Sequence, residues 1–311
     1  MPDPARPILI AGPTASGKSA LALALAQEVG GCVINADALQ VYACWQVLSA
    51  RPDPAELALA PHYLYGHVAC DVAYSTGHWL RDVGECLRNA QALGQRPIII
   101  GGTGLYFSAL TKGLAEIPPI DVEIRNAGNT LREMGNTQEM LDYLRDNDPQ
   151  TLKQIDQRNP ARVQRAWEVL RSSGTGLAAW HRQTPPPLVP YDTATCLVLD
   201  ADRDWLAKRI DRRFNLMLET GALDEVRAVL QSGWNPALPA MQAIGAGELA
   251  AYLQGKLSRD QAIEQGCAAS RQYAKRQRTW FRNRMKDWQR VCAETAGQNS
   301  DLIRQITAAV P

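Results

Sequence analysis

The stretch that most constrains the fold of this 311-residue chain is Gly12–Ser19, with the sequence GPTASGKS. An apolar run, Ile8–Ile10, precedes it, and apolar residues follow it at helical spacing at Leu21, Leu25 and Val29. A strand, a glycine-bearing loop and a helix in this order form the context in which G-x-x-x-x-G-K-[ST] binds phosphates. A glycine turn with no ligand is the alternative. We predict an α/β fold of the P-loop type, a doubly wound parallel sheet, and a ligand with at least two phosphates.

Each position of this loop has a chemical reason. Gly12 and Gly17 let backbone N–H groups close around an anion, and the helix start adds its positive dipole end. Lys18 adds a positive charge, and the Ser19 hydroxyl suits a Mg²⁺ ligand. The predicted phosphate-binding residues are Gly12, Pro13, Thr14, Ala15, Ser16, Gly17, Lys18 and Ser19.

A second apolar run, Cys32–Asn35, is typical of a buried strand and is followed closely by Asp37. Ligands of doubly wound sheets bind beyond the carboxyl ends of the strands, so Asp37 is expected to face the phosphate loop. An aspartate that caps the next helix is the alternative interpretation.

A third apolar run, Pro97–Ile100, ends at Gly101, Gly102 and Gly104. A helix is expected over 77–93, before this strand. Three glycines at the end of a strand allow the backbone to approach a ligand closely. A tight turn from strand to helix explains them equally well.

From about Gly113 to Pro190 the strand-like runs disappear and polar helical segments follow one another. Asn159 is predicted to cap one of them, with Pro160 at its first position. We therefore predict a helical insertion over 113–190 within a core formed by 1–112 and 191–311. The predicted helices of the insertion are Val122–Met134, Gln138–Arg145 and Pro160–Arg171.

After the insertion, Thr195–Asp200 restores the strand pattern, and a helical C-terminal region follows. In a helix over 204–219, Arg209 and Arg213 lie one turn apart on one face. A later helix, read as extending to Arg290, has two different faces. Its basic stripe comprises Arg271, Lys275, Arg278, Arg282, Lys286 and Arg290, and its apolar stripe comprises Tyr273, Trp280, Phe281, Met285 and Trp288.

The basic stripe fits a phosphate backbone, and a solvated amphipathic helix is the alternative. The whole chain is nearly neutral, with 33 basic and 32 acidic residues, so only this local charge is informative. No apolar run of about 18 residues exists, and we expect no membrane span. Seven scattered cysteines predict free thiols in a reducing cytoplasm, and the four histidines show no metal-ligand spacing.

Several longer stretches resemble the tRNA dimethylallyltransferases, which attach an isopentenyl group to an adenosine beside the anticodon. The resemblance covers almost the whole chain in the family's order, and its second and last stretches are specific to the family. The matching stretches are Gly12–Ser19, Ile34–Tyr42, Gly101–Tyr106, Asn159–Ala166, Ala243–Gly245 and Arg271–Arg282.

The resemblance implies dimethylallyl diphosphate as the donor, Mg²⁺ as the cofactor and the anticodon stem-loop of tRNA as the acceptor. It assigns Asp37 as the general base and Thr103 as a contact to the RNA near the reacting base. Arg213 and the phosphate loop stabilise the diphosphate leaving group, with Ser19 holding the metal. We expect a cytoplasmic monomer.

The resemblance also implies a set of tRNA contacts. These are Asp37, Ala38, Leu39, Gln40, Thr103, Arg125, Ala161, Arg162, Val163, Gln164, Arg165, Lys275, Arg278 and Arg282. The chain departs from the family in two places: the family usually has Ser where Ala38 stands, and Tyr-Lys where Ala246-Gly247 stand. The second departure affects a contact to the RNA.

Two other classes of protein stay open from the sequence. In a small-molecule P-loop kinase or ATPase, Asp200 at the end of its apolar run would order a metal. A non-catalytic RNA-binding protein would use the phosphate loop as an anchor only. Within the transferases, a free adenine nucleotide is the alternative acceptor.

Overall fold

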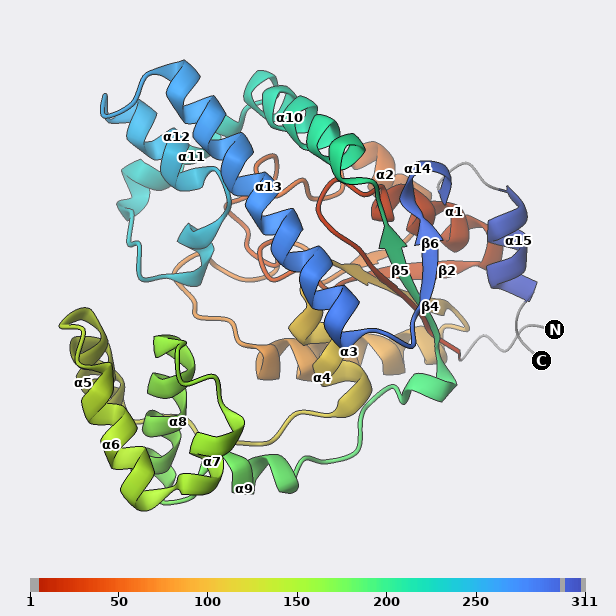
Figure 1. The fold of residues 1–311 in the computed structure, drawn as a ribbon. Helices are drawn as coiled ribbons and strands as arrows, with labels where there is room; N and C mark the ends of the chain where they lie inside the picture. Colours follow the sequence, from red (N-terminus) through yellow and green to blue (C-terminus); the bar gives the residue numbers. More distant parts are fainter. Residues whose placement is uncertain (1–5, 297–299, 309–311) are drawn as a thin grey trace. The chain divides into compact units, whose positions relative to one another are not determined.

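The computed structural model describes residues 6–296 and 300–308. The chain forms two compact units, of which the first comprises Met1–Thr111 and Leu188–Pro311, and the second Lys112–Pro187. Figure 1 shows the sheet and its helices in the first unit and the helices labelled α5 to α9 in the second.

The first unit is built on a six-stranded sheet in the order β3-β2-β4-β1-β5-β6. All of its strand pairs are parallel. β1 lies in the middle, where Ile10 is in register with Ile100 of β4 and with Leu197 of β5. The predicted α/β fold of the P-loop type is confirmed. The strands are β1 (Ile8–Ala11), β2 (Gly31–Asn35), β3 (His62–Tyr63), β4 (Arg96–Gly101), β5 (Thr195–Asp200) and β6 (Gln289–Cys292).

Helices cover both faces of this sheet because alternate strand residues point to opposite sides. Ile8 and Ile10 belong to the apolar cluster that contains Leu21 of α1 (Lys18–Val29). Leu9 belongs to the opposite cluster, with Trp79 of α3 (Thr76–Ala92) and residues of α4 (Gly104–Lys112). The core is therefore doubly wound, and the carboxyl ends of β1, β2 and β4 all open towards one edge of the sheet.

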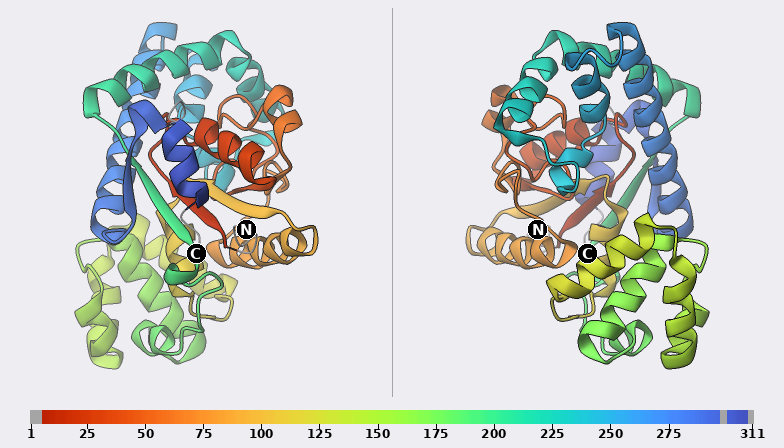
Figure 2. Two further views of the ribbon diagram at one scale, coloured as in Figure 1. Left: turned by 90° about the vertical axis from the view of Figure 1, so that its right-hand side faces the viewer. Right: turned by 90° about the vertical axis from the view of Figure 1, so that its left-hand side faces the viewer.

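A helical region adjoins this edge and forms an apolar cluster of its own with the segment that follows β2. α10 and α13 lie side by side in Figure 1 and in both views of Figure 2. The main helices of the region are α10 (Arg203–Glu219), α11 (Ala222–Gly233), α12 (Ala246–Leu253) and α13 (Arg259–Arg284). The remaining short elements of the first unit are α2 (Pro54–Leu59), η1 (Tyr191–Thr193), η2 (Pro239–Gln242), α14 (Ala293–Ala296) and α15 (Ser300–Ala308).

The prediction that the basic helix continues to Arg290 is wrong. α13 ends at Arg284, and Arg290 lies in β6, paired in register with Val198 of β5. Met285 and Trp288 are buried in the apolar cluster that contains Leu9 and Trp79, and β6 covers the open hydrogen-bonding edge of β5. Lys286 and Arg290 are consequently not part of the helical basic stripe.

The second unit is a small helical bundle around Met140, Leu144, Val163 and Trp167. The helices predicted from the sequence are present, with bounds that differ by one or two residues. Asn159 caps α8, since its side chain accepts hydrogen bonds from the N–H groups of Ala161 and Arg162. The helices of this unit are α5 (Val122–Glu133), α6 (Thr137–Asn147), α7 (Pro149–Gln154), α8 (Pro160–Ser173) and α9 (Leu177–Arg182).

The prediction that all seven cysteines are free is wrong for one pair. Cys44 and Cys70 form a disulfide with their Cα atoms 6.1 Å apart. The segment after β2 folds back on itself, and backbone bonds from Ala43 and Val68 bring the two cysteines together across 26 positions. Scattered spacing could not reveal this. Throughout the described residues, no helix has both the length and the apolar character that a bilayer crossing requires.

Candidate active site

The phosphate loop joins β1 to α1 as the sequence predicts. Ala15 (φ 62°) and Gly17 (φ 87°) adopt left-handed conformations, which turn successive N–H groups towards one concave side and make an anion nest. The Ser16 hydroxyl is buried, and the described part of the chain offers it no hydrogen-bond partner. The loop thus has the backbone geometry of an anion site.

Three cations from two helices hold this loop. Lys18 donates to the carbonyl oxygen of Pro13 at 3.1 Å. Arg213 of α10 donates to the Thr14 hydroxyl, and Arg209, one turn before it, donates to the carbonyl of Ala15 at 2.9 Å. The predicted shared face of these two arginines is therefore the face that contacts the loop.

Burial sets the charge of two of these groups. It lowers the pKa of Lys18 to about 8, an effect that the Asp37 carboxylate opposes and Arg213 reinforces. Burial also lowers the pKa of Arg213 to about 10, again opposed by Asp37. Because Asp37 acts on both cations, its carboxylate lies within electrostatic range of the phosphate loop.

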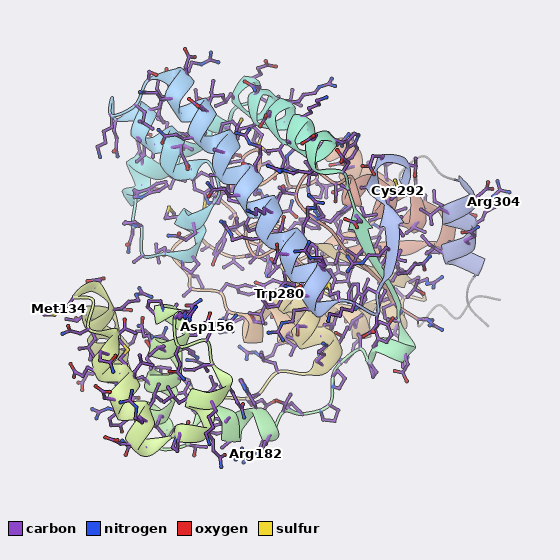
Figure 3. The ribbon with its side chains drawn as sticks, in the orientation of Figure 1. Met134, Asp156, Arg182, Trp280, Cys292 and Arg304 are labelled. Atoms are coloured by element: carbon purple, nitrogen blue, oxygen red, sulfur yellow. A yellow bond between two sulfur atoms is a disulfide. The ribbon has the colours of Figure 1, made fainter. Side chains whose placement is uncertain are left out.

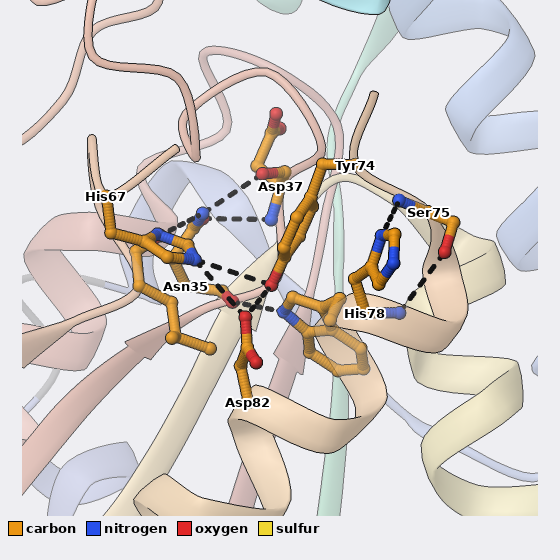
Figure 4. Close-up of polar contacts among 9 residues, drawn as sticks. Asn35, Asp37, His67, Tyr74, Ser75, His78 and Asp82 are labelled. Carbon is orange, nitrogen blue, oxygen red and sulfur yellow. Dashed lines mark hydrogen bonds and ion pairs between the residues drawn. The ribbon is translucent and has the colours of Figure 1, made fainter. Parts of the chain in front are cut away.

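Asp37 follows β2 and does not cap a helix, because the next helix begins only at Pro54. Its Oδ1 accepts a hydrogen bond from Leu39 N–H at 2.9 Å. Asn35, fully buried at the end of β2, holds the Asp37 backbone on both sides. The Asn35 amide accepts from Asp37 N–H at 2.8 Å and donates to the Asp37 carbonyl at 3.0 Å (Figure 4).

Further contacts hold the surroundings of Asn35. The Trp79 indole of α3 donates to the Asn35 carbonyl at 2.8 Å. Tyr74 donates to Asp82, and Ser75 and His78 cap the start of α3 with reciprocal bonds (Figure 4). The sequence analysis missed Asn35, although its place directly before Asp37 on a buried strand was the available signal.

The glycine turn after β4 packs against protein rather than being left open. A Cβ on Gly101 would lie 2.0 Å from the Ala36 carbonyl oxygen, and one on Gly104 would lie 2.1 Å from the Trp280 ring. Trp280 lies near the end of α13 in Figure 3. This close packing places Thr103, whose hydroxyl accepts from Ala38 N–H at 2.9 Å. The turn therefore brings Thr103 next to the Asp37 segment.

Gln277 of α13, which sequence analysis did not single out, joins the two loops. Its side chain is buried and makes one bond to Thr14 and one to Gly102. Tyr273 lies one turn earlier, where burial raises its pKa and hydrogen bonds to Thr103 and Gln277 act in the opposite direction. Both residues stand in the family-specific stretch Arg271–Arg282, which was the signal available.

A cavity of about 60 Å³ lies between the phosphate loop, the segment after β2 and the helices α10 and α13. Thr14, Asp37, Arg213 and Tyr273 contribute its polar wall near the phosphate loop. The rest of the lining is mainly apolar: Leu39, Leu48, Ile210, Phe214, Met217, Ala243 and Ile244, with Ser49 and Ser270. An anion site thus adjoins a small apolar space.

Glu225 of α11 fixes one wall of this cavity. Its carboxylate accepts hydrogen bonds from the N–H groups of Gln46, Val47 and Leu48 at 2.7–3.0 Å. Three bonds from successive amides hold Leu48 in place. None of these wall residues carries a sequence pattern that predicts its role.

The other candidate RNA-contacting side chains of the first unit differ in their exposure and in the partners they already have. The Gln40 amide already donates to the carbonyls of Ser49 and Ala50, so it holds the loop. Leu39 lines the cavity. On α13, Lys275 and Arg282 are exposed and Arg278 is partly exposed, while Arg271 pairs with Asp211.

In the second unit, Ala161 and Arg162 are exposed at the start of α8 and Arg165 is partly exposed. Val163 and Gln164 are buried in the bundle, Gln164 bonded to Asn129 and Glu168. RNA contacts by these two side chains are therefore not retained. Arg125 is about half exposed and lies 3.5 Å from the buried Glu168 carboxylate.

The sequence of the chain matches one family of known proteins over most of its length. A family model described as IPP transferase matches residues 40–284, and one described as isopentenyl transferase matches residues 6–65. A tRNA dimethylallyltransferase of Cereibacter sphaeroides is 58% identical over 92% of this chain and 88% of its own length. The chain belongs to the tRNA dimethylallyltransferase family. A Paracoccus denitrificans relative of the same name is 57% identical over 92% of this chain and 94% of its own length.

Solved structures agree with the family assignment. A tRNA isopentenylpyrophosphate transferase from Bacillus halodurans has a TM-score of 0.70 at 28% identity, covering 97% of this chain and 94% of its own. A eukaryotic dimethylallyltransferase acting on tRNA has a TM-score of 0.83 at 24% identity, covering 98% and 80%, which shows the fold. The relatives of the same name, at 57–58% identity, show that the chain is an enzyme of this family, and the kinase and non-catalytic alternatives receive no support.

Proposed function

We propose that the chain transfers a dimethylallyl group from dimethylallyl diphosphate to N6 of the adenosine beside the anticodon in tRNA. The observation that carries this proposal is the cavity in which Thr14 of the phosphate loop, Asp37 and an apolar wall meet. A phosphate loop alone would suit many enzymes, whereas an apolar space beside it suits a short prenyl chain. The name of the relatives, tRNA dimethylallyltransferase, supports the transfer of a dimethylallyl group to tRNA.

Loss of diphosphate requires that the negative charge on the leaving group be neutralised as the allylic C–O bond breaks. We assign this to the N–H groups of Gly17, Lys18 and Ser19 at the start of α1, and to the Lys18 and Arg213 side chains, which contact the loop. The N–H groups of Gly12, Thr14 and Ser16 already donate to other groups of the chain. With a pKa of about 8, Lys18 is mostly charged at neutral pH. Removal of one preorganised stabiliser of this kind costs about 10²–10³-fold in turnover.

The acceptor nitrogen is a weak nucleophile because its lone pair is delocalised into the adenine ring. Its N–H becomes acidic as the new N–C bond forms, and we assign the proton to Asp37. Oδ1 of Asp37 is bonded to Leu39 N–H, which leaves Oδ2, on the side of Gly102, to accept the proton. Asn35 fixes the Asp37 backbone, so the carboxylate is held in place before substrate binds.

The candidate Mg²⁺ ligand of the chain is the Ser19 hydroxyl. No group of three or more His, Cys, Asp or Glu side chains that could hold a metal occurs among residues 6–296 and 300–308. Ser19 is exposed at the start of α1, beside the anion nest. In the G-x-x-x-x-G-K-[ST] motif the hydroxyl at this position is a ligand of Mg²⁺, and the ion takes further oxygens from the bound phosphates and from water, so Ser19 fits. When bound, Mg²⁺ supplies charge neutralisation to the diphosphate.

We propose that the exposed cations of α13, together with Arg125, Arg162 and Arg165, contact the phosphate backbone of the RNA. Ala161, which precedes Arg162 at the exposed start of α8, is proposed to contact the RNA as well. Ala38, Leu39 and Thr103 lie next to Asp37 or line the cavity, where the reacting base would enter. The adenine must leave its stack to reach Asp37, so a flipped base is expected.

The proposal is tested with labelled dimethylallyl diphosphate, Mg²⁺ and three acceptors: an anticodon stem-loop, its unpaired linear counterpart and AMP. Stem phosphates supply affinity, so we expect kcat/KM for the stem-loop to exceed that of both others by about tenfold or more. Equal kcat/KM for AMP would overturn tRNA as the acceptor. Absence of label from all three would overturn prenyl transfer.

A further inference from the structure

One buried amide connects the two halves of the candidate active site. Gln277, 5% exposed, accepts a hydrogen bond from Thr14 N–H through Oε1 at 2.8 Å. Its Nε2 donates to the Gly102 carbonyl at 3.0 Å. Thr14 belongs to the loop after β1, and Gly102 to the turn after β4. A single side chain on α13 therefore spans two loops that are far apart in the sequence.

The two partners determine the orientation of the amide. A backbone N–H can only donate and a backbone carbonyl can only accept, so Oε1 must face Thr14 and Nε2 must face Gly102. Glutamate of the same shape would place a second acceptor against the Gly102 carbonyl. A hydrocarbon side chain of the same length would leave both backbone groups without this bond.

Both bonded loops carry groups that the proposed reaction needs. The Thr14 hydroxyl accepts a hydrogen bond from Arg213, and the loop itself is the proposed diphosphate site. Gly102 lies against Asp37, since a Cβ on Gly102 would lie 3.2 Å from Asp37 Oδ2 and 2.1 Å from Gln277 Nε2. A movement of the Gln277 amide would therefore change the separation between the leaving group and the base.

We propose that Gln277 is a positioning residue that holds the diphosphate loop in register with Asp37 and Thr103. It touches neither substrate in this role and acts through Thr14 and Gly102. The inference rests on the proposed transfer reaction. Misplacement of reacting groups by about 1 Å can cost about 10²-fold in rate, which is the size of effect expected for kcat.

Gln277→Glu separates a positioning role from a general loss of packing. Burial raises the pKa of the introduced carboxyl, so lowering the pH protonates it. The protonated form can again donate to Gly102 while its other oxygen accepts from Thr14. We therefore expect the ratio of variant to wild-type kcat to be about 10⁻² at pH 8 and to rise at least about tenfold by pH 6.

The control is Gln272→Glu, an exposed position on the same helix, whose ratio to wild type should be flat with pH. Gln277→Met keeps the length without the hydrogen bonds, and it should lower kcat at all pH values while the Kd for the stem-loop stays within about twofold. Circular dichroism melting is recorded for each variant.

The outcomes separate this inference from the proposed function. Wild-type transfer together with a flat Gln277→Glu ratio, or a Gln277→Met variant that keeps more than half of the wild-type kcat, would overturn the positioning role alone. No transfer by the wild type would overturn the proposed function and this inference with it. Should Gln277→Glu fail to fold, the kcat and the RNA affinity of Gln277→Met decide.

Discussion

The lowered pKa of Lys18 predicts an unusual pH dependence of diphosphate binding. The Lys18 ammonium lies in the phosphate loop, bonded to the Pro13 carbonyl, and burial brings its pKa to about 8. With that pKa, about nine-tenths of Lys18 is charged at pH 7 and about one-tenth at pH 9. If the charged form binds the anion, affinity should fall about tenfold between these values, or about 1.4 kcal/mol.

The assay is calorimetric titration with 3-methylbutyl diphosphate, which lacks the allylic double bond and so binds without transfer. Measurements run from pH 6.5 to 9.5, where Arg213, with a pKa of about 10, stays largely charged. The control is Lys18→Met, which should bind weakly and show no inflection near pH 8. A wild-type Kd that is constant up to pH 9.5 would refute the assignment of Lys18 to the diphosphate.

The same shift affects folding with a definite sign. The pKa of Lys18 is lower in the folded chain than its ordinary value, so the unfolded chain binds more protons between about pH 8 and 10.5. The contribution of Lys18 to the free energy of unfolding therefore rises with pH across this window. Urea unfolding of the wild type should show this rise relative to Lys18→Met, and parallel curves would contradict it.

Three further predictions concern other parts of the first unit. Asp37→Asn can still accept from Leu39 N–H but cannot take the proton, so kcat should fall about 10²–10⁴-fold with little change in the Kd for RNA; equal losses in both would make Asp37 a positioning residue. Replacing Lys275, Arg278 and Arg282 with Ala should reduce the slope of log Kd against log salt by about 0.7–0.9 per lost contact. Lys256→Ala, an exposed lysine outside the stripe, is the control, and an unchanged slope in the triple variant would limit α13 to a structural role. Gly101→Ala would push a Cβ to 2.0 Å from the Ala36 carbonyl oxygen and should lower the free energy of unfolding, measured by chemical denaturation, by about 1–3 kcal/mol. Gly247→Ala, on an exposed helix face, is the control and should not lower the free energy of unfolding.

Local signals determined much of the first unit and of the site. The spacing of Gly12, Gly17 and Lys18 after an apolar run was enough to predict the phosphate loop, because strand, loop and helix are consecutive in the chain. Asp37 was found in the same way, from the rule that ligands gather at the carboxyl ends of parallel strands. The α8 cap at Asn159 is also local, since its bonds reach only two and three residues ahead.

The tertiary structure decided what depends on contacts between distant segments. Gln277 bonds to Thr14, 263 positions away, and no spacing rule in the sequence connects them. The end of α13 was predicted too late because the amphipathic pattern continues past Arg284, whereas pairing of β6 with the open edge of β5 draws Arg290 into the sheet. The disulfide between Cys44 and Cys70 depends on a chain reversal in the same way. Patterns along a chain report the periodicity of one element, but which polar groups satisfy one another is decided only when separate elements pack.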